Sequence, residues 1–511
     1  MKKIYIILNV IAFVWISGGV IWAQQTRSGT ITDENGLPLP GATVIVENTN
    51  RGVTSDFDGN FAINAADGEV LLVSYVGYSS LRIPVAADAN YSVALQPETA
   101  LDEVIVTAFG TSTKKFFIGQ AYSYRAWAYY RLITHFAKGY LIGNPSSDPG
   151  VPIIFATEAP FESAPRASVE EVYNQMEKDI DEAIKYFKNA KPRPKGDPKH
   201  KSQININAAY GIKARIALSK GNWQVTTEAE KEARNGFPLL DKEDWLSGFN
   251  TNNLSEVIWG GNVISTETTY YRSYFYLISP TFNGSQNRSN PKIFNIERFH
   301  QIPDTDYRKQ AILPIAPNTN SSASNGQGGS YTTDPNYDTK EAFDAAKASI
   351  LSKYGMTRRH NTHPFMHVKF LQKNPGTIDP DDVIYMRASE MYLIEAEAKA
   401  MMNDIAGAQA ALAPLGSARD SAYDVTVFDT KEKFMEHIKF QRYVELYGEG
   451  FGYTDHIRWD MAIDQSNSGA SEVLYQQGFK QGKPSTNNDW IFKIPQAEID
   501  ANPNISEADQ N

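Results

Sequence analysis

The hydrophobic pattern of this chain changes its period near Lys115, and that change limits what the chain can fold into. Before it, apolar and polar residues alternate in short runs such as Thr43 to Glu47, which is typical of half-buried strands. After it, apolar residues such as Tyr122, Ala126 and Tyr129 recur every three or four positions, which is typical of helices that bury one face. The sequence therefore predicts two folding units, a small β unit followed by a larger helical one.

The composition excludes several classes of function. Of the 511 residues, 41% are hydrophobic, which is enough for more than one buried core. The net charge of −10 provides no basic surface for phosphate groups, so a nucleic-acid partner is not expected. The chain has no cysteine, which excludes disulfides, thiolate nucleophiles, cysteine metal sites and a lipid-acceptor cysteine.

The first 23 residues have the pattern of an export signal. Lys2 and Lys3 precede the apolar run from Ile4 to Trp15, and a cleavage site is expected after Ala23. The alternative is an uncleaved membrane anchor, because the apolar run approaches the ~20 residues that a membrane span needs. Either interpretation predicts that the chain is exported.

Short strand patterns follow the export signal. Runs such as Val70 to Tyr75 and Tyr91 to Leu95 predict strands, and Asp58-Gly59 is typical of a tight hairpin turn. Short strands at this spacing predict a small β-sandwich.

Three polar residues at the predicted hairpin, Asp56, Asp58 and Asn60, also suggest a calcium loop. An EF-hand loop needs glycine at its sixth position and glutamate at its twelfth, where this chain has Phe61 and Asp67. We therefore favour the hairpin turn.

The N-terminal unit closely resembles a known module. Residues 26–98 resemble the carboxypeptidase-regulatory-like domain that precedes the plug of SusC-type TonB-dependent transporters. Leu101 to Gly110 resembles a TonB box, an extended segment that adds as a strand to a partner sheet. The resemblance implies a contact with TonB through residues 102–109, and the alternative is that residues 99–117 form only a linker. We expect a protease-sensitive joint between Glu98 and Phe117.

Helical periodicity continues through much of the rest of the chain. Ser168 and Glu171 form a capping box that predicts a helix start. Alanines such as Ala396 and Ala398 let neighbouring helices approach closely, which favours tetratricopeptide-like packing. The expected helices run from Gly119 to Gly139, Ser168 to Phe187, Asn207 to Lys220, Glu228 to Arg234, Arg387 to Met402, Asp404 to Ala413, Thr430 to Tyr447 and Thr454 to Ile463.

Four sequence blocks lie within residues 118–511, namely Gly119 to Leu132 with Pro149 to Ile153, Tyr385 to Ala398, Gln441 to Phe451 with Asp455 to Trp459, and Trp490 to Pro495 with Glu498 and Asn502 to Asn504. In this order they resemble the SusD/RagB family of nutrient-binding outer-membrane proteins. The resemblance implies a mainly helical body that binds glycans on an irregular face, and it implies that the N-terminal part of the family domain is missing.

A group of charged residues in the third block has two interpretations. Arg442, Glu445 and Glu449 are spaced to share one helical face, and Asp455 and Arg458 lie one turn apart on the next element. An acid–base pair of a glycosidase is one interpretation, but its carboxylate separation depends on tertiary structure. We favour an ion-pair network that joins two packed helices.

Three of the eight histidines, His360, His363 and His367, lie close together in the sequence. Pro364 interrupts them, so a common helical face for a metal is not expected. We favour packing in loops over a metal site, and we expect no cofactor.

Residues 237–380 lack helical periodicity and are rich in aromatic residues and turns. Flat aromatic faces stack on the apolar C–H edges of sugar rings, while amide and charged groups bond the hydroxyls. For any single ring, core packing is the alternative. The candidate ligand-binding residues are Trp259, Tyr270, Tyr271, Tyr274 and Tyr276.

Together these features predict a non-catalytic glycan-binding component of an outer-membrane SusC/SusD-type uptake system. Its expected partners are an oligosaccharide and a SusC-type transporter, and its expected location is the cell outer membrane. Three alternatives stay open: a periplasmic tetratricopeptide-like adaptor, a non-functional fusion of two adjacent genes, and a glycoside-processing enzyme.

Overall fold

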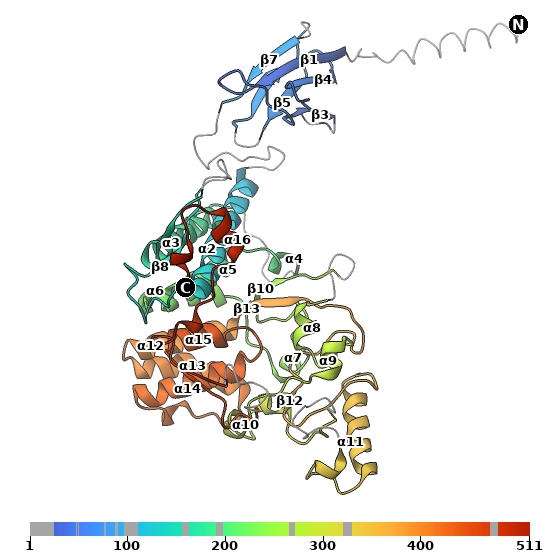
Figure 1. Ribbon diagram of the computed structural model, residues 1–511, viewed down its shortest axis with the longest axis vertical. Helices are drawn as coiled ribbons and strands as arrows, with labels where there is room; N and C mark the ends of the chain where they lie inside the picture. Colours follow the sequence, from blue (N-terminus) through green and yellow to red (C-terminus); the bar gives the residue numbers. More distant parts are fainter. Residues whose placement is uncertain are drawn as a thin grey trace, which may run out of the picture. The chain divides into compact units, whose positions relative to one another are not determined.

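The protein divides into two compact units, Met1–Thr107 and Ala108–Asn511 (Figure 1). The predicted signal segment and the TonB-box-like segment lie outside the described residues. The computed structural model describes residues 25–47, 49, 51–75, 78–86, 90–96, 111–155, 163–190, 198–264, 271–319, 330–470 and 479–511.

The N-terminal unit is a small β-sandwich, as predicted. One sheet has the order β4-β1-β7, in which β1 pairs antiparallel with β4 and parallel with β7; the other has the order β3-β2-β5-β6. Apolar side chains such as Ile31, Val44 and Leu71 alternate inward from both sheets and form one core. The strands are β1 (Gln25–Thr32), β2 (Thr43–Val46), β3 (Gly52–Thr54), β4 (Asn60–Ala65), β5 (Val70–Ser74), β6 (Leu81–Pro84) and β7 (Asn90–Ala94).

A tight turn precedes β4 at the predicted place, but the prediction of a hairpin was wrong, because the flanking strands β3 and β4 belong to different sheets. The Asp56 carboxylate accepts hydrogen bonds from the backbone N–H groups of Asp58 (3.0 Å) and Asn60 (2.8 Å). Gly59 has a φ of +76°, and a Cβ there would lie 2.4 Å from the carbonyl oxygen of Ile31. The position therefore requires glycine, and the carboxylate of Asp56 serves the turn.

The C-terminal unit is mainly helical, and its long helices pack in neighbouring pairs, α2 with α3, α5 with α6, and α12 with α13. The predicted capping box at Ser168 and Glu171 is present at the start of α3. None of the helices in the described residues is both long and apolar enough to cross a membrane. The long helices are α2 (Thr111–Phe136), α3 (Val169–Lys188), α5 (Ile206–Lys220), α6 (Trp223–Arg234), α11 (Lys340–Lys353), α12 (Ala388–Met401), α13 (Ile405–Arg419) and α14 (Lys431–Glu445).

Several predicted helix boundaries were wrong, and α13, for example, continues to Arg419 instead of ending at Ala413. Helix α2 begins at Thr111, inside the predicted joint, and Phe116 in its early part is buried against Phe187, which stabilises the helix before the predicted start. Helix α15 (Gly452–Arg458) ends before Ile463, because Asp460 adopts a φ of +50° that a right-handed helix cannot continue. Helix α6 begins at Trp223, earlier than predicted.

Residues 237–380 were predicted to be irregular, and α11 is a helix within them that this prediction missed. Short elements connect the long helices. Antiparallel pairs join β8 with β9, β10 with β13, β11 with β12 and β14 with β15. The short elements are β8 (Pro149–Pro152), β9 (Arg166–Ser168), α4 (Pro198–Lys201), α7 (Lys242–Trp245), β10 (Val257–Gly261), α8 (Tyr274–Ile278), α9 (Ser285–Ser289), α10 (Ile296–Gln301), β11 (Ile312–Leu313), β12 (Met366–His367), β13 (Val383–Arg387), β14 (Ile463–Asp464), β15 (Lys480–Gln481) and α16 (Gln496–Ala501), with 3-10 turns at Tyr307–Ala311, Tyr331–Thr333, Val425–Val427, Asn488–Trp490 and Glu507–Asp509.

Candidate functional site

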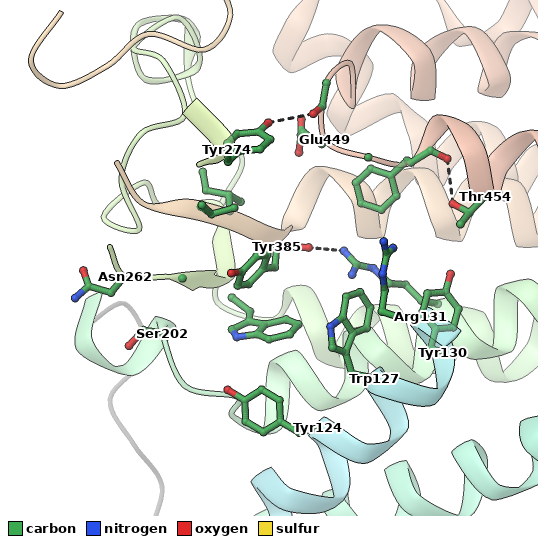
Figure 2. Close-up of a pocket in the computed structure, with 18 of the residues that line it drawn as sticks. Tyr124, Trp127, Tyr130, Arg131, Ser202, Asn262, Tyr274, Tyr385, Glu449 and Thr454 are labelled. Atoms are coloured by element: carbon green, nitrogen blue, oxygen red, sulfur yellow. Dashed lines mark hydrogen bonds between the residues drawn. The ribbon is translucent and has the colours of Figure 1, made fainter. Parts of the chain in front are cut away.

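A cleft of about 1000 Å³ opens in the C-terminal unit, between α2, the β10–β13 sheet and the loop that follows α14. Figure 2 shows its side chains converging from these elements. Aromatic rings provide much of its wall, namely those of Tyr124, Trp127, Tyr130, Trp259, Tyr274, Tyr385 and Phe451.

The two-stranded β10–β13 sheet brings Trp259 and Tyr385 together. Its register shifts at Trp259, and the two rings lie 5.0 Å apart between centroids. The next residue, Gly260, leaves no room for a side chain, because a Cβ would lie 2.1 Å from Oδ1 of Asn252. The glycine therefore allows the strand to pass close to Asn252 while Trp259 meets α2.

The cleft aromatics form a connected set that has a floor and a rim. Trp259 is 4% exposed and meets Trp127 edge to face at 5.5 Å, and Tyr130 stacks on Trp127 at 5.6 Å. By contrast, Tyr124 is 45% exposed and Tyr385 is 43% exposed. The buried rings therefore support the site, while the two rim tyrosines offer ring surface to a ligand.

Arg215 closes the inner end of the cleft. Its guanidinium lies between the rings of Trp127 and Phe451, 5.2 Å from each centroid. It also donates two hydrogen bonds to the Glu390 carboxylate, at 2.7 and 2.6 Å. A third hydrogen bond goes to the carbonyl oxygen of Tyr385, at 2.6 Å, and Figure 2 shows it as a dashed line. Its charge is therefore compensated within the protein.

The loop after α14 forms the opposite wall and carries Glu449. Gly448 and Gly450 on either side adopt φ values of +80° and +86°. The Glu449 carboxylate accepts hydrogen bonds from Lys369 (2.7 Å) and from two nitrogens of Arg387 (2.7 and 2.8 Å). Burial alone would raise the pKa of Glu449, but these two cations outweigh burial and lower it.

Glu445, one turn earlier, is the centre of a buried group of charges. Its carboxylate contacts Arg308 at 2.9 Å, Arg387 at 2.6 Å and Arg419 at 3.2 Å, and all four side chains are at most 1% exposed. Burial favours the neutral acid, yet the three guanidinium groups hold the pKa of Glu445 well below its usual range. We call these residues, with Glu256, Asp306, Lys369 and Glu449, the Glu445 cluster.

The favoured interpretation of the charged group in the third block, an ion-pair network, is confirmed. Arg442 binds both carboxylate oxygens of Asp455 at 2.9 Å, which joins α14 to α15, and Arg458 pairs with Asp455 and Glu397. The expectation that Glu449 shares a helical face with Arg442 was wrong, because α14 ends at Glu445 and Glu449 lies in the following loop.

The five candidate ligand-binding residues separate in space. Trp259 and Tyr274 line the cleft, and the Tyr274 hydroxyl donates a hydrogen bond to the carbonyl oxygen of Gly448 at 3.1 Å. Tyr271 and Tyr276 pair with each other at 5.2 Å and do not line it. Tyr270 lies outside the described residues.

Sequence reasoning missed the cleft residues that α2 contributes. The stripe through Tyr122, Ala126 and Tyr129 packs into the core, as predicted. A second set on the same helix, Tyr124 and Trp127, faces the cleft (Figure 2). Aromatic residues on more than one face of a helix were the signal that could have revealed this second surface.

Two of the three grouped histidines are buried and contact backbone carbonyl groups. Nε2 of His360 lies 3.1 Å from the carbonyl oxygen of Phe282, and Nε2 of His367 lies 3.1 Å from that of Ile278. Burial lowers the pKa of His367 to about 3. Within the described part of the chain, no group of three or more histidine, aspartate or glutamate side chains is arranged to hold a metal ion.

Family models match both units, and one of the matches crosses the boundary between them. Residues 255–511 match the SusD family model, and residues 78–218 match a model described as starch-binding associating with outer membrane. Residues 27–106 match the CarboxypepD_reg-like domain.

The curated relatives match the N-terminal region. TonB-dependent receptor SusC of Bacteroides thetaiotaomicron is 39% identical over 110 residues, which are 21% of this chain and 11% of the receptor. TonB-dependent receptor P26 of Formosa agariphila is 40% identical over 102 residues, which are 20% of this chain and 10% of the receptor. The chain thus spans about a tenth of the length of these relatives.

Solved structures match most of the chain. A SusD-like carbohydrate-binding protein of Bacteroides vulgatus has a TM-score of 0.59 at 22% identity, covering 78% of this chain and 79% of that one. A SusD superfamily protein of Bacteroides thetaiotaomicron has a TM-score of 0.58 at 22% identity, covering 79% and 80%. Surface glycan-binding protein A of Bacteroides uniformis has a TM-score of 0.52 at 17% identity, covering 79% of each chain. At these identities the likeness shows the fold.

Proposed function

This chain belongs to the SusD family, and from that premise we propose that its C-terminal unit captures an oligosaccharide in the aromatic cleft without cleaving it. The cleft of about 1000 Å³ has room for several sugar rings. Two half-exposed tyrosines on its rim, Tyr124 and Tyr385, are the observation that carries this proposal. Sugar rings present apolar C–H faces, and exposed aromatic faces stack on them.

The acidic side chain in the cleft favours binding over hydrolysis. Glycosidases use two carboxyl groups, one of which stays protonated near neutral pH. Among the described residues that line the cleft, Glu449 is the only carboxylate, and Arg387 and Lys369 hold it in the charged form. A carboxylate with a lowered pKa is a poor proton donor to a glycosidic oxygen.

The proposed setting is an outer-membrane uptake complex with a SusC-type transporter. The match of residues 78–218 to a family described as associating with the outer membrane supports the location. The likeness of the N-terminal unit to SusC-type receptors supports the partner and a contact with TonB through residues 102–109. In this setting the cleft retains a glycan before the transporter imports it.

The test is calorimetry on the exported protein with a panel of oligosaccharides of matched length, among them maltoheptaose. Loss of a stacked ring removes about 1 kcal/mol, so Tyr124→Ala and Tyr385→Ala should each weaken binding by roughly tenfold or less. Both rings are half exposed, so the melting temperature should change little. Loss of binding only in variants that also unfold would contradict the proposal.

Tyr271→Ala is the matched control, because Tyr271 is 56% exposed and lies outside the cleft lining. It should bind like the unmodified protein. If Tyr271→Ala abolishes binding while the two cleft variants bind normally, the ligand site lies at the Tyr271–Tyr276 pair instead. If no oligosaccharide in the panel binds, the adaptor interpretation replaces this one.

A further inference from the structure

We infer that the cleft selects anionic oligosaccharides, whose carboxylate or sulfate groups are bound by Arg131. This inference rests on the proposed function, since it assigns a ligand class to the same cleft. Arg131 lies on α2 at the rim, and its guanidinium carbon is 5.8 Å from the centroid of the Trp127 ring (Figure 2).

Arg131 differs from the other charged groups of the cleft, because the part of the chain that the structure describes gives it no carboxylate partner. The Arg215 charge is compensated by Glu390, and the Glu449 charge is compensated by Arg387 and Lys369. Among the described residues, no carboxylate lies within ion-pair distance of the exposed Arg131 side chain. The lining therefore carries one uncompensated positive charge.

The charges just behind the cleft do not remove this excess. Beside Phe451, the Arg442 guanidinium is held by Asp455, and Arg458 is held by Glu397 and Asp455. These pairs are closed within the protein and at most 9% exposed. The chain as a whole has a net charge of −10. The positive charge of Arg131 at the rim of the cleft is a local exception to this negative charge, and it attracts anions.

The geometry of α2 suits a sugar acid. Tyr124, Trp127 and Arg131 follow one another at spacings of three and four residues, so they lie along one face of the helix. Arg131 is about 6 Å along the helix axis from Trp127. A sugar ring stacked beside Tyr124 or Trp127 therefore has the guanidinium within reach of its acidic substituent, which an arginine binds with two parallel hydrogen bonds.

The experiment compares ligands that differ only in charge. Titration calorimetry of the full chain uses hexagalacturonate, its methyl ester, a sulfated hexasaccharide and neutral maltohexaose. We expect hexagalacturonate to bind roughly tenfold or more tightly than its methyl ester, because hydrogen bonds to charged groups are the stronger ones. Higher salt should weaken the binding of the charged ligands and leave that of the neutral ones unchanged.

Arg131→Gln should remove the preference for the free acid and leave the affinity for the methyl ester unchanged. Arg131→Lys should retain part of the preference, since lysine keeps the charge and loses the paired geometry. The matched control is Arg272→Gln, because Arg272 is also exposed over an aromatic ring, that of Tyr271, outside the cleft lining. This control should bind every ligand like the unmodified protein.

The outcomes separate this inference from the proposed function. If the ester and the free acid bind equally and Arg131→Gln changes neither, the charge preference is wrong while glycan capture stands. If no ligand binds, the proposed function itself fails. Stronger binding of the sulfated hexasaccharide than of hexagalacturonate would assign Arg131 to sulfate, and the reverse order would assign it to uronate.

Discussion

The two units of this protein are stabilised in different ways. The sandwich core consists of apolar side chains such as Val44 and Leu71, and its buried Arg27 pairs with Asp67, whose side chain is 60% exposed. The C-terminal unit buries whole ion pairs, and Glu445 and Arg419 are both inaccessible to solvent. The sandwich depends on a local pattern of alternating residues, whereas the helical unit also depends on partners that are distant in sequence.

The Glu445 cluster joins segments from Glu256 to Glu449. Desolvating so many charges costs about as much as their attraction returns, so such clusters contribute little net stability. Removing one member has a much larger cost, because it leaves the opposite charges buried without a partner. We infer that the cluster serves mainly to determine which segments pack together.

The largest expected effect comes from Glu445→Gln. The amide cannot compensate Arg308, Arg387 and Arg419, so the free energy of unfolding of the C-terminal unit should fall by about 3–5 kcal/mol. In scanning calorimetry the transition of this unit should move to lower temperature while that of the sandwich stays in place.

Leu71→Ala is the reciprocal change. Leu71 is fully buried in the sandwich, so its truncation should cost about 2–5 kcal/mol and lower only the sandwich transition. If either substitution moves both transitions together, the two units do not unfold independently and the comparison fails.

The next largest difference between the two units is expected in how their stability changes on acidification. All eight histidines lie after residue 107. Burial lowers the pKa of His367 and that of His437 to about 3. The unfolded chain therefore binds more protons than the folded one between about pH 3 and 6.5, and the C-terminal unit should lose stability as the pH falls through that window.

Acids whose pKa is raised by burial oppose this trend, namely Asp381, Asp455 and, with the largest shift, Glu230. Burial raises the pKa of Glu230 to about 9, so the folded chain binds this proton more tightly than the unfolded chain. The contribution of Glu230 to the stability of the folded unit therefore increases as the pH falls towards 4.5. Thermal melts from pH 7 to pH 5 should show a falling transition for the C-terminal unit and a nearly constant one for the sandwich. Glu230→Gln should make the fall steeper, and a fall confined to the sandwich would contradict the assignment.

The smallest effect is expected for an exposed ion pair of the sandwich. Arg82 and Glu47 lie 2.9 Å apart, with side chains that are 56% and 27% exposed. Such pairs contribute below about 1 kcal/mol, so Glu47→Gln should barely change the sandwich transition, and added salt should reduce the difference further. A loss as large as that from Glu445→Gln would show that burial is not what separates the two kinds of ion pair.

Local patterns predicted much of the fold. The tight turn at Gly59 and the capped start of α3 follow from residues that lie within a few positions of each other. The early start of α2 does not follow from such a local pattern, because it depends on the contact between Phe116 and Phe187. The sequence resemblance named the family, but the spacing of residues alone did not.

The candidate site was predictable only in part. Trp259 and Tyr274 were identified because their segment is rich in aromatic residues. Tyr124, Tyr385 and Arg131 were not, because each is brought to the cleft by helix packing or by the pairing of β10 with β13. Their roles depend on contacts between segments that are far apart in the chain.

The position of Glu449 has a consequence for how this protein can evolve. Glu449, on one wall of the cleft, is itself a member of the Glu445 cluster and pairs with Arg387, so its substitution would disturb the core as well as the proposed binding site. The opposite wall has half-exposed Tyr124 and Arg131 on the surface of α2, and neither belongs to a buried ion-pair cluster among the described residues. Related proteins that diverge in the glycan they recognise should therefore vary on the α2 side of the cleft and retain the acidic residue on the other.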